Sequence, residues 1–167
     1  MPYSDHFRLA DDMISHLDSI VVSTADTFIQ SRYTGFVTVA AVTVYELAVK
    51  DILIAFAHNK HKAFGAFTEA SLRRLNGRIA LDDLRKLVKK FGAKYDKRFG
   101  HLLDASDRQL LAQGGNVPRA AYGNILVWRN SFAHEGIIPS TATYPEATNA
   151  YHVGKEVLHC LARAMQR

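Results

Sequence analysis

Apolar residues recur at the spacing of an α-helix along most of the chain, and no series of alternating positions predicts a β-sheet. Within "LDDLRKLVKKFGAKYDKRF", for example, Leu84, Leu87, Val88 and Phe91 follow the i, i+3, i+4, i+7 pattern of one helix face. Such segments follow one another without a repeat or a linker that would divide the chain. We therefore expect a single all-α domain over residues 1–167, built as an antiparallel up-and-down helical bundle.

Residues that start or stop helices, interspersed in the apolar pattern, predict where these helices begin and end. A first helix is expected over about Ser4–Ser31, ended by "RYTG", and a second over about Thr34–His58, apolar nearly all round and so central. Next come a short helix ending at Asn76-Gly77, an amphipathic helix over Leu81–Phe99 and a short helix in "LLDASDRQLLAQ". A helix over Pro118–His134 follows, and the last helix runs from Pro145 to about Met165. The Pro118–His134 helix is expected to bury Ala121, Ile125, Trp128 and Phe132.

Positive charge is concentrated in one part of the chain. The whole protein carries a net charge of +5, yet the segment Arg73–Arg98 alone holds ten lysines and arginines against three aspartates, a local charge of +7. Such a segment predicts either a polyanionic partner or a solvated helix face, and charge alone does not separate the two. The residues that we expect to contact RNA, if the partner is RNA, are Arg85, Lys86, Lys89, Lys90, Lys94 and Lys97.

The remaining composition indicates a protein of the cytoplasm. One cysteine, Cys160, excludes an internal disulfide and is expected in the core. The most apolar stretch, residues 35–57, is interrupted by Glu46, Lys50 and Asp51, which would be costly in a bilayer, so we expect no membrane span. The first residues contain no apolar run typical of a signal peptide.

The stretch "WRNSFAHEG" places four chemically useful residue types where the helix over Pro118–His134 ends. His134 can exchange a proton near neutral pH, and the guanidinium of Arg129 can bind phosphate oxygens through two donors. Asn130 can orient the imidazole or a substrate. Together these groups would suffice to cleave RNA without a metal, because the 2′-hydroxyl of RNA can attack its own phosphate.

Two considerations complicate this interpretation. Arg129 and His134 leave an ideal helix about 140° apart, so they would need a curled arginine, a loosened last turn or a second copy of the helix to meet at one target. Basic residues in a last helical turn can also simply cap free carbonyls and interact favourably with the helix dipole.

The segment nevertheless resembles the HEPN superfamily, which is marked by Arg-x4–6-His on a late helix of an α-bundle, often with a polar residue directly after the arginine. Arg129, Asn130 and His134 match that motif. "VYELAVKDIL" resembles the glutamate-bearing long helix of these domains, and "RIALDDLRKLVKKFG" with "DKRFG" is similar to a segment of the RiboL-PSP and MAE-type groups. The resemblance covers about residues 35–165, with an extra N-terminal helix over about residues 4–31.

The resemblance implies a homodimer whose two motifs line a shared cleft and act as a metal-independent endoribonuclease, without cofactors. It assigns proton transfer to His134, phosphate stabilisation to Arg129 and positioning to Asn130. Glu46 is implied as an acid that holds Arg129, or else pairs with Lys50 on its own helix. HEPN proteins recur in toxin–antitoxin, abortive-infection and CRISPR-linked systems, which implies a toxin or phage-defence effector with an antitoxin protein as partner. Gly136 stands where some of these toxins carry a tyrosine, which argues against regulation by modification there.

Alternative functions stay open at this point. The chain could be a non-catalytic HEPN module that binds RNA, a nucleotide or a protein partner, or a helical scaffold. Metal binding is disfavoured: His58 and His61 fit a solvated helix end, and His152, Glu156 and His159 share a helix face but lack a second Glu-x-x-His helix.

Overall fold

The computed structural model describes residues 2–73, 75 and 79–166, and these residues form helices and no strand. The expected all-α class is confirmed. A 3-10 turn, η1 (Tyr3–His6), leads into α1 (Phe7–Val21), α2 (Thr27–Lys60), α3 (Lys62–Leu72), α4 (Leu81–Lys89), α5 (Ala93–Ala112), α6 (Pro118–Glu135) and α7 (Tyr144–Met165). Of the helices described, none has the length and apolar character needed to cross a bilayer.

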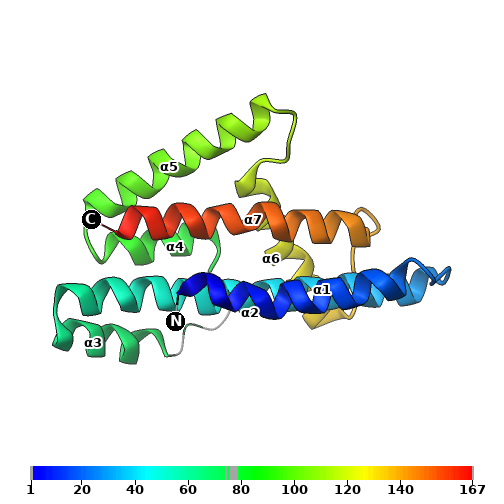
Figure 1. The fold of residues 1–167 in the computed structure, drawn as a ribbon, viewed down its shortest axis with the longest axis horizontal. Helices are drawn as coiled ribbons and strands as arrows, with labels where there is room; N and C mark the ends of the chain where they lie inside the picture. The colour runs from blue at the N-terminus through cyan, green and yellow to red at the C-terminus, as the bar shows by residue number, and fades with distance from the viewer. Residues whose placement is uncertain (1, 74, 76–78, 167) are drawn as a thin grey trace.

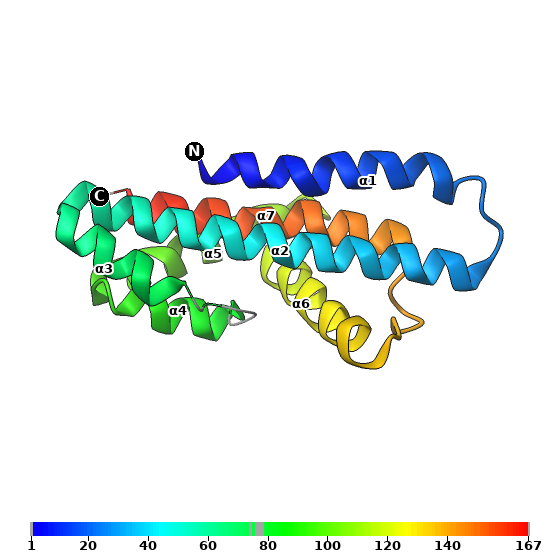
Figure 2. The same cartoon turned by 90° about the horizontal axis from the view of Figure 1, so that it is seen from below.

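The long helix α2 is the axis of the fold. Figure 1 shows α1 running antiparallel along it, and α7 lying beside α2 and running in the same direction. In the view of Figure 2, α1 covers one side of α2, while α3, α4 and α6 lie on the opposite side. The central place that the sequence predicted for this helix is confirmed, since Val37, Ala48 and Leu53 on it are fully buried.

Three stacked tyrosines tie the core of the bundle together. The Tyr45 ring on α2 lies 5.1 Å from that of Tyr122 on α6 and 5.9 Å from that of Tyr151 on α7, centroid to centroid, at small interplanar angles. The hydroxyls of all three donate to backbone carbonyls, those of Tyr151, Ile79 and Phe7 respectively. Each ring is therefore buried with its one polar atom satisfied, which is the condition for tyrosine in a core.

The predicted boundary between the first two helices is wrong. The helix is interrupted at residues 22–26, before "RYTG". The "RYTG" sequence itself lies inside α2. The hydroxyls of Ser23 and Thr24 donate to the Ile20 carbonyl, and the Asp26 carboxylate accepts the first free N–H groups of α2 from Phe28 and Ile29. Side-chain capping thus ends α1 and starts α2.

The expected helix over Leu81–Phe99 is also wrong, because it divides at Gly92. There φ is +138°, a value that side chains rarely adopt, and the N–H groups of residues 90–92 bond three residues back as the turn tightens. Consequently α5 takes in both the end of that pattern and the separately predicted "LLDASDRQLLAQ" helix. The predicted end at Asn76-Gly77 lies outside the described residues.

Candidate functional site

The motif helix α6 has the bounds that its sequence predicted. Pro118 occupies its first turn, and Gly136 follows its last residue in the left-handed conformation, with φ +67° and its N–H bonded to the Phe132 carbonyl at 3.0 Å. This is the usual glycine cap of a helix. A tyrosine at position 136 would be strained at that φ, so the departure from the toxin pattern has a backbone cause.

The end of α6 packs against the first half of α2 through apolar contacts and one hydrogen bond. An added Cβ on Gly35 would lie 2.3 Å from the Phe132 ring, so the two helices approach as closely as they do only because residue 35 has no side chain. The Phe132 ring also meets Phe36 edge-on, 5.9 Å between centroids. Arg32 Nη1 donates to the Gly136 carbonyl at 2.7 Å.

The three motif side chains lie at the surface of this fastened helix end. Asn130 and His134 are exposed and Arg129 is half-buried, with its Nη1 donating to Asn130 Oδ1 at 3.1 Å. Within the described part of the chain, no hydrogen bond or ion pair engages the His134 side chain. Because α6 stays regular through Glu135, Arg129 and His134 leave it about 140° apart, and the last turn does not loosen.

Only part of the capping alternative is excluded in this arrangement. The Gly136 N–H bonds the Phe132 carbonyl and Arg32 donates to the Gly136 carbonyl, whereas no hydrogen bond from Arg129 or His134 to a terminal carbonyl is found among the described residues. His134 still lies in the last turn of α6, where the helix dipole favours a positive charge. An imidazole and a guanidinium that solvent can reach, with an amide hydrogen-bonded to the guanidinium, can hold a phosphate and move a proton.

Two predicted core residues of α6 are more exposed than expected. Ala121 and Ile125 are buried, but Trp128 and Phe132 are only half-buried. In Figure 2 the second half of α6 lies on the side of α2 away from α1, and none of the other described helices lies over it. The consequence is an apolar surface beside the motif.

We call this surface the apolar face; it consists of the exposed residues Phe28, Phe36, Val39, Val127 and Ile137. Phe28 is 62% exposed and carries the Arg32 guanidinium over its ring at 4.6 Å. Exposed apolar side chains that gather near one another can mark a contact surface, and these five lie on the first half of α2, on α6 and just after α6. Neither this face nor Arg32 was found from the sequence, because "RYTG" was interpreted as a break and not as a helix beside the motif.

Glu46 lies half-buried on α2. The pKa of Tyr122 on α6 is raised mainly by the burial of Tyr122 and further by the nearby charge of Glu46. Glu46 therefore faces the motif helix nearer to its start than to its end. Its role as the acid that holds Arg129 stays a prediction, as does its pairing with Lys50.

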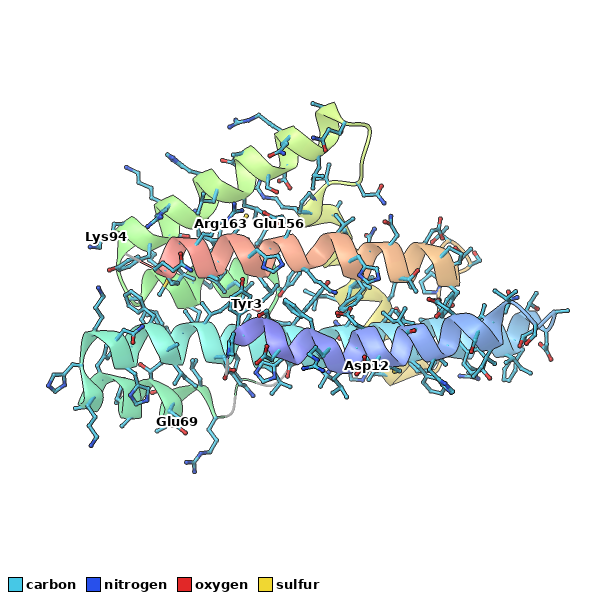
Figure 3. The ribbon with its side chains drawn as sticks, viewed as in Figure 1. Tyr3, Asp12, Glu69, Lys94, Glu156 and Arg163 are labelled. Carbon is cyan, nitrogen blue, oxygen red and sulfur yellow. The ribbon has the colours of Figure 1, made fainter. Side chains whose placement is uncertain are left out.

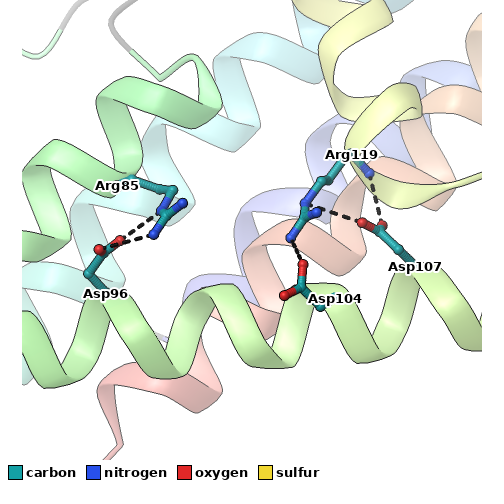
Figure 4. A network of polar contacts seen from close by, with 5 residues as sticks. All are labelled: Arg85, Asp96, Asp104, Asp107 and Arg119. Atoms are coloured by element: carbon teal, nitrogen blue, oxygen red, sulfur yellow. Dashed lines mark hydrogen bonds and ion pairs between the residues drawn. The ribbon is translucent and has the colours of Figure 1, made fainter.

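The predicted RNA-contacting cations lie on α4 and the start of α5, and all six are exposed. They do not share one face. Arg85 is bound by the Asp96 carboxylate through bonds of 2.8 and 3.1 Å, as Figure 4 shows, and it lines a polar cavity of 380 Å³ together with Lys97 and Arg119. Arg119, at the start of α6, is held by Asp104 and Asp107 of α5.

Lys86 and Lys90 instead line the opposite side of α4, toward α3. Lys94 lies at the first turn of α5, at the outer end of the molecule in Figure 3, with its ammonium 4.9 Å from the Tyr95 ring. Since Arg85 has a tight carboxylate partner, the lysines are the more available cations of the set.

Two of the histidines that could suggest a metal, His61 and His159, have other partners. His61 Nδ1 accepts a hydrogen bond from the Ala63 N–H and so caps the start of α3. His159 Nδ1 lies 2.7 Å from the Tyr3 hydroxyl, in a contact between the N-terminal turn and α7. Glu156 pairs with Arg163 at 2.6 Å; both are labelled on α7 in Figure 3. Among the described residues, no group of three or more histidine, cysteine or acidic side chains is arranged to hold a metal ion. Cys160 is fully buried, as predicted.

Comparison with known proteins identifies a family for this chain. No curated protein and no solved structure matches the chain. A family model described as RiboL-PSP-HEPN matches residues 4–167, a span that includes α1 as well as the long helix and the motif helix. The chain therefore belongs to the RiboL-PSP-HEPN family.

Proposed function

We propose that this protein is a metal-independent endoribonuclease that cleaves RNA at a site shared by two copies of the chain. His134 transfers the proton, Arg129 stabilises the phosphate and Asn130 positions the guanidinium that it contacts. The observation that carries the proposal is the end of α6, where the Gly136 N–H and Arg32 make the terminal hydrogen bonds and the half-buried Arg129 and exposed His134 make none to a carbonyl among the described residues.

The chemistry follows from the groups present. The 2′-oxygen of a ribose forms a bond to the adjacent phosphorus as it loses its proton to the neutral imidazole of His134. The bond from phosphorus to the 5′-oxygen of the next nucleotide breaks, and that oxygen takes up a proton from water, while the His134 imidazolium returns its proton to solvent. The guanidinium of Arg129 lies against the phosphate oxygens, where negative charge grows. The products are a 2′,3′-cyclic phosphate and a 5′-hydroxyl.

A second copy supplies what one copy lacks. Arg129 and His134 diverge by about 140° on a regular helix, so one α6 does not aim both at one phosphate. The apolar face lies beside them on α2 and α6, and pairing two such faces about a two-fold axis would bury it and bring the two helix ends together. The homodimer is thus proposed from the geometry of the motif and from the exposed side chains next to it.

The test is cleavage of a labelled single-stranded RNA in EDTA by the wild type, Arg129→Ala and His134→Ala. We expect cleavage with a cyclic phosphate end by the wild type, and a loss of about 100-fold or more in each variant, the usual contribution of a proton-transfer group or a phosphate-stabilising donor. Arg8→Ala, at an exposed position on α1, is the matched arginine control and should cleave normally. Intact RNA with a salt-dependent mobility shift would instead favour a non-catalytic RNA-binding module.

We further propose that the enzyme acts as a toxin or phage-defence effector held in check by an antitoxin protein. A nuclease of this kind would stop growth when expressed alone. Expression of the wild type in a bacterial host should therefore arrest growth, and His134→Ala at equal protein level should not. Arrest by both proteins would separate toxicity from RNA cleavage and contradict this role.

A further inference from the structure

An aromatic groove opens between α3 and α4, away from the motif. Its volume is 270 Å³, and three phenylalanines, Phe64, Phe67 and Phe91, are among the residues that line it. Phe67 is 68% exposed and Phe64 37% exposed, so the two rings offer their surfaces to solvent. We call this the aromatic groove. Apolar rings that gather in one groove and stay exposed are typical of a ligand or partner site.

Two of the rings that line the groove, those of Phe64 and Phe91, pack on other aromatic side chains. The Phe91 ring lies 5.7 Å from that of Phe64 and 5.8 Å from that of the buried Phe56, centroid to centroid. Phe56 in turn contacts Tyr95 of α5 at 4.9 Å. Phe64 is therefore the outer member of a packed aromatic cluster, and Phe67 lines the same groove with more of its ring exposed to solvent.

Lysines lie on the α4 side of the groove. Lys90 lines it, and Lys86 lines an adjoining groove of 490 Å³ along the same side of α4. Lys60 and Lys62 are exposed where α2 passes into α3. Asp83, the one acid among the described residues that line either groove, lies 3.7 Å from the Lys86 ammonium.

We propose that the aromatic groove binds single-stranded RNA, with an unpaired base stacked on Phe67 and the flanking phosphates on Lys86 and Lys90. The inference rests on the proposed function only in taking RNA as the substrate class. Aromatic rings interleaved with lysines match the alternation of bases and phosphates along a single strand, whereas paired bases in a duplex present no free face. A protein segment would fill the same groove with apolar side chains but would not need the surrounding lysines.

The groove lies on the same side of α2 as the motif helix, because α3, α4 and α6 are all on that side in Figure 2. A strand held at the groove can therefore continue toward the end of α6 without passing around the bundle. The groove would hold the strand and the motif would cut it.

The test measures binding and not cleavage, in a His134→Ala background, with a 12-nucleotide RNA carrying 2-aminopurine. Stacking on Phe67 should quench the fluorescence of that base. Phe67→Ala should abolish the quenching and weaken binding by about fivefold or more, the range seen for loss of one stacked base. Leu111→Ala, at a position on α5 with 63% exposure, is the matched control and should bind as the parent does.

A second probe separates stacking from charge. An abasic oligomer of the same length keeps the phosphates, so Phe67→Ala should not change its affinity, while Lys90→Ala should weaken both oligomers and lower the salt dependence by about one ion. Unchanged RNA affinity and quenching in Phe67→Ala overturn the proposal and leave the groove to a protein segment. Stacked RNA that the wild type never cleaves would support the groove while contradicting the nuclease.

Discussion

At the scale of single residues, Arg32 does more for the motif than its position in the sequence suggests. Its guanidinium donates to the Gly136 carbonyl and lies over the ring of Phe28, so one side chain joins the end of α6 to the start of α2. The two residues in this hydrogen bond are 104 positions apart in the chain. No local pattern reveals such a partner, whereas Arg129, Asn130 and His134 could be found because their spacing on one helix is itself the signal.

His159 is a second residue whose role depends on a distant partner, and it makes stability depend on pH. Burial lowers the pKa of His159, while Glu156 opposes and Arg163 adds to that shift. The unfolded chain, with a histidine pKa of ~6.5, then binds more protons than the folded one. Stability is fully present above that pH and is lost as the pH falls through the lower folded pKa.

We therefore expect the free energy of unfolding in urea to fall between pH 7.5 and 5.5, and to fall less in His159→Gln. Protonation would also occupy Nδ1, which lies 2.7 Å from Tyr3 OH, and loosen the N-terminal turn from α7. Burial lowers the pKa of His152 as well, so part of the slope should remain in the variant. His16→Gln on the exposed side of α1 serves as control, and an equal reduction of slope in both variants would refute the assignment.

At the scale of elements, capping residues and close contacts between helices set the helix bounds that hydrophobic periodicity does not determine. The bounds of α6 follow from Pro118 and Gly136, two residues whose backbone preferences act locally, and the sequence predicted them correctly. Gly35 was misinterpreted for the opposite reason. It looks like a helix breaker in "RYTG", but its lack of a side chain serves a contact with Phe132 on another helix.

Two glycine substitutions separate these roles. Gly35→Ala would place a Cβ 2.3 Å from the Phe132 ring, so we expect a loss of about 1–3 kcal/mol in stability and reduced RNA cleavage, because Phe132 lies between Asn130 and His134 on α6. A Cβ at Gly123, within the same α6, would meet nothing within 4 Å. Gly123→Ala should therefore gain about 0.5–1 kcal/mol from helix propensity alone. Urea unfolding measures both, and a stable, fully active Gly35→Ala protein would show that the contact does not hold the motif.

At the scale of the whole molecule, the sequence predicted the all-α class and the central long helix, because a segment that is apolar nearly all round must be covered on every side. It did not predict how α7 lies along α2 or how α6 crosses to the outer edge. Those placements depend on the stacking of Tyr45, Tyr122 and Tyr151, which no periodicity encodes. The crossing matters for function, since it leaves both the motif and the apolar face uncovered.

If two copies share each cutting site, two inactive variants should restore each other. In a dimer of Arg129→Ala with His134→Ala, one of the two composite sites joins the intact His134 of the first chain to the intact Arg129 of the second. Random pairing of equal amounts makes half of the dimers mixed, so the mixture should regain about a quarter of the wild-type cleavage rate. A site contained in a single chain would regain nothing.

Adding Phe36→Glu to both variants supplies the control, because a carboxylate on the apolar face should oppose its burial against a second copy. Rescue should then disappear while circular dichroism stays that of a folded helical protein, and light scattering should report the monomer mass. Leu111→Glu, on an exposed part of α5 outside that face, should leave both rescue and mass unchanged. Rescue that survives Phe36→Glu would locate the shared site on another surface, since only contact between the two chains can bring the surviving imidazole and guanidinium to one phosphate.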